Sequence, residues 1–255
     1  MDALNENTRF IDASDGTPES VWLHAPGLDA IPAVDPQTLV PAGSRAVVVA
    51  PHPDDEVLSV GGLMAELSAA GREICVVAVT DGDASHPGSS LWSASELACV
   101  RRHETRIALR RLGLQHEAIR LGLPDGGLQA RREELADQIA ALLQPNDVVF
   151  CTWRLDGHPD HDATGEACAT ATSRAGAKLI EVPVWAWHWS RPGDPRLPWA
   201  RALRLPLGAD AVRRKREAVT AFRSQLEPDV TTGAPPILRA STVARASRPF
   251  EIVFA

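Results

Sequence analysis

Two clusters of histidine and acidic residues hold the side chains of this sequence that are best suited to chemistry. The first reads PHPDDE over residues 51–56, and the second reads DGHPDHD over residues 156–162. Neighbouring carboxylates are costly to bury, and proteins normally offset that cost with a cation or a metal ion. Imidazole nitrogen and carboxylate oxygen together suit Zn²⁺, and a catalytic zinc site takes about three protein ligands while leaving a position for water. The two clusters therefore predict a metal site.

Each cluster directly follows an apolar segment that is typical of a buried strand, and such segments alternate along the chain with helical patterns. We expect strands over residues 45–50, 73–80, 118–123, 147–153, 179–187 and 250–254, the last at an edge, and helices over residues 61–71, 93–112, 130–144, 160–174 and 209–222. This alternation predicts an α/β protein with a Rossmann-like three-layer fold, in which a mostly parallel sheet carries helices on both faces. Ligands in such folds bind beyond the carboxyl ends of the strands, so the two clusters should face each other.

Length and composition predict how the chain is organised. With 255 residues, of which 44% are hydrophobic, it can bury one large core. Residues 1–43 are rich in Pro, Asp and Gly and end in a turn-like PAGS segment, so we expect an irregular N-terminal arm there. Residues 44–255 are expected to form a single catalytic domain.

The formal net charge of −7 argues against nucleic acid as a partner, because proteins that bind it usually carry a basic surface. The four cysteines have no CxxC spacing and indicate reduced thiols. The first residues do not resemble a secretory signal, and no apolar run approaches the ~20 residues of a membrane span. We therefore expect a cytoplasmic protein with a small-molecule substrate and no membrane partner. The oligomeric state stays open.

The segments APHPDDE at residues 50–56 and HPDH at residues 158–161 resemble the two hallmark motifs of the PIG-L/LmbE-like deacetylase family. This resemblance implies that His52, Asp55 and His161 bind one zinc ion per chain. Fe²⁺ and Co²⁺ can occupy the same kind of ligand set, so the physiological metal stays open.

The resemblance also implies the roles of three further residues. Asp54 matches the family's general base, and His158 matches the residue that stabilises the oxyanion or protonates the leaving amine. Asp160 would orient and charge His158. These roles agree with the chemistry of a metal-assisted hydrolysis, in which a carboxylate removes a proton from water and a charged histidine opposes the developing negative charge.

Weaker matches extend the resemblance from about Arg45 to Gln225. Segments of the family that border the substrate correspond here to Asp81, Arg101 and Asp125. One departure concerns the position two residues before HPDH, where some sugar-deacetylating members have a tyrosine and this chain has Asp156. The chain contains no tyrosine at all, so any oxyanion contact made by that residue must be absent.

Structural roles are the alternatives for both motifs. Asp54 and Asp55 could cap the first turn of a helix that starts at a Pro-Asp pair. The HPDH segment alone could be a solvated turn before a helix. Because the two motifs occur together, the metal site is the favoured interpretation.

Three other features each allow two interpretations. Trp185, Trp187 and Trp189 would share one face of a strand, and packing is favoured over a platform that stacks on a sugar. The basic run at residues 213–216 is favoured as a solvated helix face over an anion site. The Pro-rich segment at residues 191–206 could form a lid that faces the substrate.

The sequence therefore predicts a zinc-dependent hydrolase that removes an N-acetyl or N-acyl group from an amino sugar or a glycoside. Two alternatives stay open: the same site acting on a non-sugar amide, a thioester-linked intermediate or a cyclic imide, and a metal-dependent ligand-binding protein without catalysis. A serine hydrolase is disfavoured because no GxSxG segment occurs. A dinucleotide site is disfavoured because the turn after the first strand is acidic.

Overall fold

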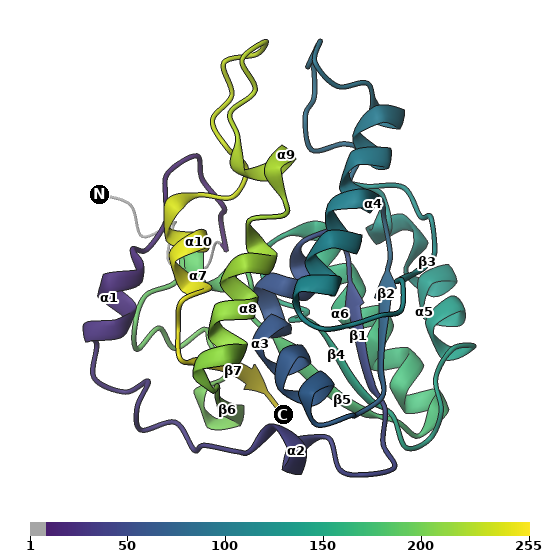
Figure 1. Ribbon diagram of the computed structural model, residues 1–255, viewed down its shortest axis with the longest axis vertical. Helices are drawn as coiled ribbons and strands as arrows, with labels where there is room; N and C mark the ends of the chain where they lie inside the picture. The colour runs from purple at the N-terminus through teal and green to yellow at the C-terminus, as the bar shows by residue number, and fades with distance from the viewer. Residues whose placement is uncertain (1–8) are drawn as a thin grey trace.

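A seven-stranded sheet forms the centre of the structure, which is a computed structural model and describes residues 9–255 (Figure 1). The strands are β1 (Ala46–Ala50), β2 (Ile74–Ala78), β3 (Ile119–Arg120), β4 (Val148–Thr152), β5 (Lys178–Val182), β6 (Ala202–Pro206) and β7 (Phe250–Phe254). Their order in the sheet is β3-β2-β1-β4-β5-β7-β6. Strands β1 to β5 pair in parallel, whereas β7 is antiparallel to both β5 and β6. The expected mostly parallel sheet is confirmed.

Helices cover both faces of this sheet. They are α1 (Glu19–His24), α2 (Pro36–Leu39), α3 (Asp55–Ala69), α4 (Ala94–Arg111), α5 (Arg132–Ala140), α6 (Pro159–Ala175), α7 (Ala186–Trp189), α8 (Ala209–Val219), α9 (Arg223–Leu226) and α10 (Ala240–Arg245), with 3-10 turns at Leu128–Arg131 and Trp199–Arg201. Within residues 9–255, none of the helices has the length and apolar character needed to cross a lipid bilayer.

The side chains of β1 show how the layers form. Successive residues of a strand point to opposite faces of the sheet. Ala46 and Val48 belong to the apolar core that contains α3, α4 and α8, whereas Val47 and Val49 belong to the core that contains α5 and α6. The three-layer arrangement follows from this alternation, and Figure 1 shows the two sets of helices on either side of the strands.

Neighbouring strands bring the two motifs together. β1 and β4 pair in register, with Val49 opposite Cys151. The chain therefore leaves both strands at the same edge of the sheet, and it enters α3 at Asp55 and α6 at Pro159 within a few residues. This edge is the one at which an α/β fold binds its ligands.

Residues 9–43 are less irregular than the composition predicted, because they include α1 and α2. Trp22 of α1 is fully buried, and its indole N–H donates to the carbonyl of Trp187 at 3.1 Å. Glu19 forms a buried ion pair with Arg248 at 2.5 Å. These contacts fasten α1 to the C-terminal part of the fold. The rest of the predicted arm, residues 1–8, lies outside the described residues.

The strand expected over residues 179–187 is wrong in its second half. β5 ends at Val182, and the chain turns into the short helix α7 at Ala186. The carboxylate of Asp156 accepts hydrogen bonds from the backbone N–H groups of Val184, Trp185 and Ala186, which takes this backbone out of the sheet. The three indoles at residues 185–189 therefore do not share a strand face.

Three further expectations are also corrected. β7 lies between β5 and β6 and is not an edge strand, because its five residues pair along all of β6. The Pro-rich segment at residues 191–206 supplies β6, the outermost strand. In the basic run, Arg213 is exposed, but Lys215 is buried at 4% exposure, so this run is not entirely a solvated face.

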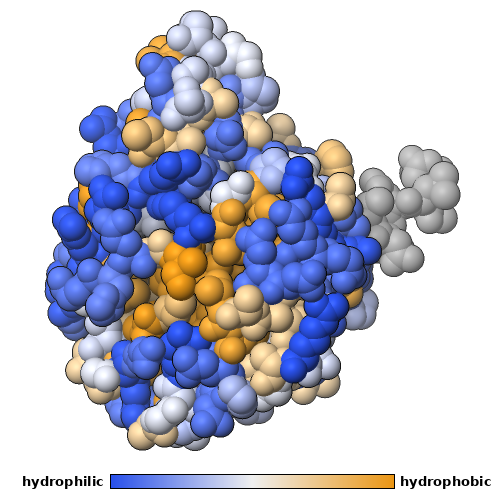
Figure 2. Space-filling model, turned by 90° about the vertical axis from the view of Figure 1, so that its right-hand side faces the viewer, coloured by the Kyte–Doolittle hydropathy of each residue, from blue (hydrophilic) through white to orange (hydrophobic). Residues whose placement is uncertain are grey.

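The opposite edge of the sheet is only partly covered. Figure 2 shows apolar side chains on the face that lies to the right in Figure 1. β3 has only two residues and cannot pair with the whole of β2. Ile74, Val76, Leu114 and Ile119 line a hollow at this edge.

Candidate metal and catalytic site

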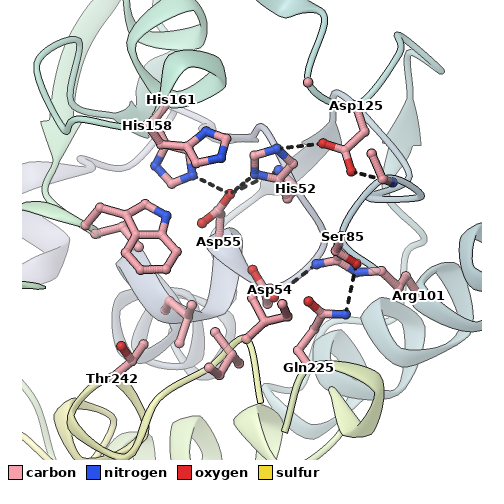
Figure 3. A pocket seen from close by; sticks show the side chains of 17 residues that line it. His52, Asp54, Asp55, Ser85, Arg101, Asp125, His158, His161, Gln225 and Thr242 are labelled. Carbon is pink, nitrogen blue, oxygen red and sulfur yellow. Dashed lines mark hydrogen bonds and ion pairs between the residues drawn. The ribbon is translucent and has the colours of Figure 1, made fainter. Parts of the chain in front are cut away.

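A cavity of about 330 Å³ opens beyond the carboxyl ends of β1 and β4 (Figure 3). Both sequence motifs contribute side chains to it, including His52, Asp54 and Asp55 from the first and His158 and His161 from the second. The expected meeting of the two clusters is thus confirmed. The cavity also has an apolar wall, formed by Leu58, Val184, Trp185, Ile237 and Leu238.

Three potential metal donors converge on one point. The Oδ2 atom of Asp55 lies 3.2 Å from Nδ1 of His52 and 3.2 Å from Nε2 of His161, and Figure 3 shows the carboxylate reaching both rings. A ring nitrogen of His158 lies near the two other histidines, all within 4.8 Å of one another. Two imidazoles and a carboxylate are donors that suit a catalytic zinc ion.

His161 provides a test of whether these residues fit a metal ion. The residue is fully buried, and its Nε2 atom makes no hydrogen bond to any part of the described chain. It faces Oδ2 of Asp55 at 3.2 Å, and buried polar atoms that make no hydrogen bond are uncommon in proteins. A metal ion at this point would use the lone pair of Nε2, so the arrangement fits a metal.

Asp156 fixes the orientation of His161, a role that the sequence analysis missed. Its Oδ2 lies 2.8 Å from Nδ1 of His161, so Nδ1 carries a proton and Nε2 is left to face Asp55. Burial alone would lower the pKa of His161, but Asp55 and Asp156 outweigh burial and raise this pKa to about 9. Carboxylates that hold the far nitrogen of a metal-binding histidine are common in metal sites. Asp156 occupies the position where the resemblance drew attention to a missing tyrosine.

His52 is held in a similar way by two other carboxylates. Its Nε2 lies 3.1 Å from Asp125 and 3.2 Å from Asp160, which leaves Nδ1 facing Asp55. Burial opposes the protonated form of His52, but these carboxylates raise its pKa well above the usual value.

The expected role of Asp160 needs correction, because its carboxylate faces His52 and not His158. The same carboxylate accepts hydrogen bonds from the backbone N–H groups of Gly126 and Leu128, at 2.7 and 3.1 Å. These bonds fasten the loop after β3 to the start of α6. The helical turn at Pro159 directs Asp160 to this side, whereas His158 is the residue that precedes the helix.

His158 lies beside the metal donors with its ring at the cavity. Its Nδ1 accepts a hydrogen bond from the backbone N–H of Asp160 at 3.2 Å, so the proton of the neutral ring is on Nε2. Burial lowers the pKa of His158 to about 3, and the neighbouring His161 and His52 add to this effect. This direction favours the neutral form of His158, whereas the sequence analysis expected a charged histidine.

Asp54 adopts an unusual backbone conformation just before α3. With φ of 116°, it is the single non-glycine residue with a positive φ among residues 9–255. Such strained conformations persist where the surroundings enforce them, often in active sites. Burial raises the pKa of the Asp54 carboxyl, although the nearby Arg101 opposes this effect. The carboxyl is thus a stronger base than a free aspartate.

Arg101 holds Asp54 and lines the cavity. Its Nη2 atom donates to Oδ2 of Asp54 at 3.1 Å and to the carbonyl of Pro53, while Nη1 donates to the carbonyl of Gly82 at 2.8 Å. Gly82 has a φ of +68°, and a Cβ atom there would lie 2.0 Å from Nη1 of Arg101. A glycine is needed for this close approach.

The three residues that the sequence associated with substrate are not all in the cavity. Arg101 and Asp125 line it. Asp81 does not, because its carboxylate is turned toward Arg102 and Arg120 outside the cavity. No residue of the segment 191–206 lines the cavity in the described chain either, so this segment is not a lid over it.

Gln225 and the apolar wall were not predicted. The side chain of Gln225 is fully buried, its Nε2 atom donates to Ser224, and its Oε1 atom has no hydrogen-bond partner among the described residues. The wall residues Ile237 and Leu238 lie beyond the part of the chain that carries the resemblance. These residues are far from the motifs in the sequence, and only the folded chain brings them to the cavity. Local sequence patterns therefore could not identify them.

Comparison with known proteins agrees with this site. Residues 47–172 match the family described as GlcNAc-PI de-N-acetylase (PIG-L). A Corynebacterium diphtheriae protein described as 1D-myo-inositol 2-acetamido-2-deoxy-alpha-D-glucopyranoside deacetylase is 37% identical over 177 residues, covering 57% of this chain and 56% of that protein. The chain thus spans little more than half the length of this curated relative.

Solved structures share the fold. The structure of the antimicrobial reagent A40926 pseudoaglycone deacetylase has a TM-score of 0.60 and 26% identity, and the match covers 83% of this chain and 96% of that one. N,N'-diacetylchitobiose deacetylase from Pyrococcus horikoshii has a TM-score of 0.56 and 24% identity, over 71% of this chain and 70% of that one. Both motifs lie inside the matched residues, so over this region the chain is similar to the PIG-L deacetylases.

Proposed function

We propose that this protein is a zinc-dependent hydrolase that removes an N-acetyl or N-acyl group from an amino sugar or a glycoside. The observation that carries the proposal is the convergence of His52, Asp55 and His161 beside Asp54 and His158 in one cavity. The matched family and the deacetylases of similar sequence support the same activity.

His52, Asp55 and His161 would hold one zinc ion. A bound zinc ion supplies Lewis-acid polarisation of the acyl carbonyl and makes water more acidic. The Nε2 atom of His161, which faces Asp55 without a hydrogen bond, and the carboxylates behind both histidines support this assignment.

The protein's own groups carry the proton transfers. Asp54 takes a proton from the attacking water and passes it to the departing amine, and Arg101 keeps its carboxylate turned toward the cavity. His158 donates its Nε2–H to the acyl oxygen as negative charge develops there. Hydrolysis of the amide then yields a carboxylic acid and a free amine.

The cavity also bears on the substrate. The Oε1 atom of Gln225 offers an acceptor for a sugar hydroxyl group, while Trp185 and Leu238 provide apolar surface in the same cavity. This mixture supports a substrate with a polar ring and an apolar substituent. A non-sugar amide hydrolysed at the same site is the alternative that substrate screening separates.

Two further expectations belong to this proposal. Residues 44–255 form one catalytic domain with an N-terminal arm fastened to it. The protein works in the cytoplasm, which its four free cysteines support because reducing compartments keep thiols unpaired.

The test measures metal content and amine release together. Protein purified without a chelator is analysed for bound metals by mass spectrometry, and free amine is measured with an N-acetylglucosamine glycoside before and after zinc is added. The proposal expects about one zinc ion per chain and zinc-dependent amine release. Zinc binding without turnover on any N-acyl amine would instead favour a ligand-binding protein, and failure to bind metal would overturn the mechanism.

A further inference from the structure

Helix α3 is interrupted one turn after it begins. Val60 has φ of −128° and ψ of 29°, which are not helical values, so a first turn at residues 55–59 is set at an angle to the remainder of α3. The first turn carries Asp55 and Leu58, which both line the cavity. Whatever fixes the interruption therefore also fixes the direction in which Asp55 points.

Two charged side chains from distant parts of the chain meet at this interruption. Lys215 of α8 and Glu251 of β7 form an ion pair at 2.6 Å, and both residues are at least 95% buried, with exposures of 4% and 5%. Figure 1 shows α8 lying beside α3. A buried ion pair needs additional hydrogen bonds to offset the loss of hydration.

The ion pair obtains those hydrogen bonds from the backbone of α3. The two oxygen atoms of Glu251 accept from the N–H groups of Gly62 and Leu63, at 2.7 and 2.9 Å. The Nζ atom of Lys215 donates to the carbonyl of Leu58 at 3.1 Å. In an uninterrupted helix, the N–H of Gly62 would pair with that same carbonyl of Leu58. Lys215 and Glu251 therefore satisfy the backbone groups on both sides of the break.

The adjacent glycines make room for this arrangement. A Cβ atom on Gly61 would lie 3.3 Å from Cγ of Lys215, and a Cβ atom on Gly62 would lie 3.0 Å from Oε1 of Glu251 and 2.3 Å from Leu207. A side chain at Gly62 would clash with Leu207, and one at either glycine would crowd the ion pair. The two glycines thus leave the space that the ion pair needs beside the break in α3.

We propose that Lys215 and Glu251 are positioning residues that set the angle of the first turn of α3 and thereby hold Asp55 and Asp54 in place at the metal site. The inference rests on the proposed metal site and assigns a role to a pair that does not contact the cavity's chemistry directly. A pair that served only stability would not alter metal affinity in the folded protein.

The test compares two double variants of the full chain. Lys215→Met with Glu251→Gln removes the charges at the break and nearly preserves side-chain volume. Arg248→Met with Glu19→Gln is the matched control, because that ion pair is also buried but joins α1 to the C-terminal segment. Zinc affinity is measured by competition with a chromophoric chelator, and hydrogen exchange of residues 55–60 is measured without metal.

The variant with Lys215→Met and Glu251→Gln is expected to bind zinc about 10–100-fold more weakly, as is usual when groups that orient metal ligands are removed. Its amides in the first turn of α3 should also exchange faster than in the parent. The control should keep the parent's zinc affinity and exchange in this turn even where its melting temperature falls. The inference would be overturned if the variant with Lys215→Met and Glu251→Gln kept both the zinc affinity and the hydrogen exchange of the parent.

Two further arms keep the outcome interpretable. If the double variant does not fold, Glu251→Asp keeps the charge while withdrawing the carboxylate from the two N–H groups, and unchanged zinc affinity in that variant would equally overturn the inference. If the parent binds no metal, the proposed function fails, and exchange of residues 55–60 in the metal-free chain still decides whether Lys215 and Glu251 hold this turn.

Discussion

Asp156 and His161 form a fully buried pair in which a carboxylate oxygen lies 2.8 Å from Nδ1 of the imidazole. The same carboxylate accepts hydrogen bonds from the three backbone N–H groups of residues 184–186, just after the end of β5. One side chain therefore joins the orientation of a candidate metal ligand to the path of the chain beside the cavity. Its two oxygens have no capacity left for another donor of this kind.

Replacing Asp156 with Asn tests this relationship. An amide has one oxygen, so its NH₂ group must face either the N–H of His161 or backbone N–H groups that need an acceptor. We expect zinc affinity to fall about 10–100-fold, as when other groups behind metal-binding histidines are lost. Competition with a zinc-binding dye measures the change.

Asp162→Asn is the matched control for this variant. Asp162 lies in the same cluster and accepts the N–H of Gly157 at 3.0 Å, a bond that an amide oxygen can retain. Its zinc affinity should stay close to that of the parent. Equal affinities in the parent and in Asp156→Asn would contradict the orienting role.

Asp54→Asn should separate metal binding from proton transfer. The amide keeps the size of the side chain and a partner for Arg101, but it cannot accept a proton from water. We expect kcat to fall by roughly 10²–10⁴-fold, the usual contribution of a general base. Metal content should match that of the parent. Turnover at the parent's rate would remove Asp54 from this role.

Metal removal should lower stability as well as activity. Without an ion, the Nε2 atom of His161 stays buried 3.2 Å from the carboxylate of Asp55 and makes no hydrogen bond. Free zinc at 100 times its dissociation constant should stabilise the folded chain by about 2.7 kcal/mol. Thermal unfolding is followed after dialysis against a chelator and after zinc is restored. In the control variant His161→Ala, zinc should not change the melting temperature. If zinc did not change the melting temperature of the parent either, the metal site would be contradicted.

The elements that position the site were largely predictable from local patterns. The apolar segments before His52 and before Asp156 become β1 and β4, because short apolar runs bounded by turn residues are typical of buried parallel strands. The failures were long-range. Nothing near Trp185 indicates that Asp156 will accept its backbone N–H, and nothing near Phe250 indicates that β6 will pair outside β7.

In the site, too, local features could be predicted from the sequence and long-range features could not. The motifs identified the residues that converge, but they could not tell which way each carboxylate points. Asp160 faces His52 and not the adjacent His158, since the start of α6 turns consecutive side chains in different directions. Gln225 and the residues of the apolar wall come from distant segments, so their contribution depends on how the chain closes around the cavity.

Asp125 and Asp81 allow a paired test of which loop carboxylate acts at the site. Both follow strands, but Oδ1 of Asp125 lies 3.1 Å from Nε2 of His52, whereas Asp81 is engaged by Arg102 and Arg120. Asp125→Asn should lower kcat/KM by about 10–100-fold, because an acceptor behind His52 is weakened. Asp81→Asn should leave kcat/KM close to the parent's value, because the Asp81 carboxylate is turned away from the cavity.

Steady-state kinetics of both variants on one N-acyl substrate supplies the comparison, first at a limiting zinc concentration and then with zinc in excess. A larger loss in Asp81→Asn than in Asp125→Asn would mean that the loop after β2 reaches the substrate through a conformation different from the one described, and the assignment of Asp125 would have to be withdrawn. If Asp125→Asn loses activity and added zinc restores it, the carboxylate acts by holding His52. If zinc does not restore it, the carboxylate contacts the substrate directly. The geometry favours the first outcome, because the Oδ2 atom of Asp125 already accepts the N–H of Ala84 at 2.9 Å.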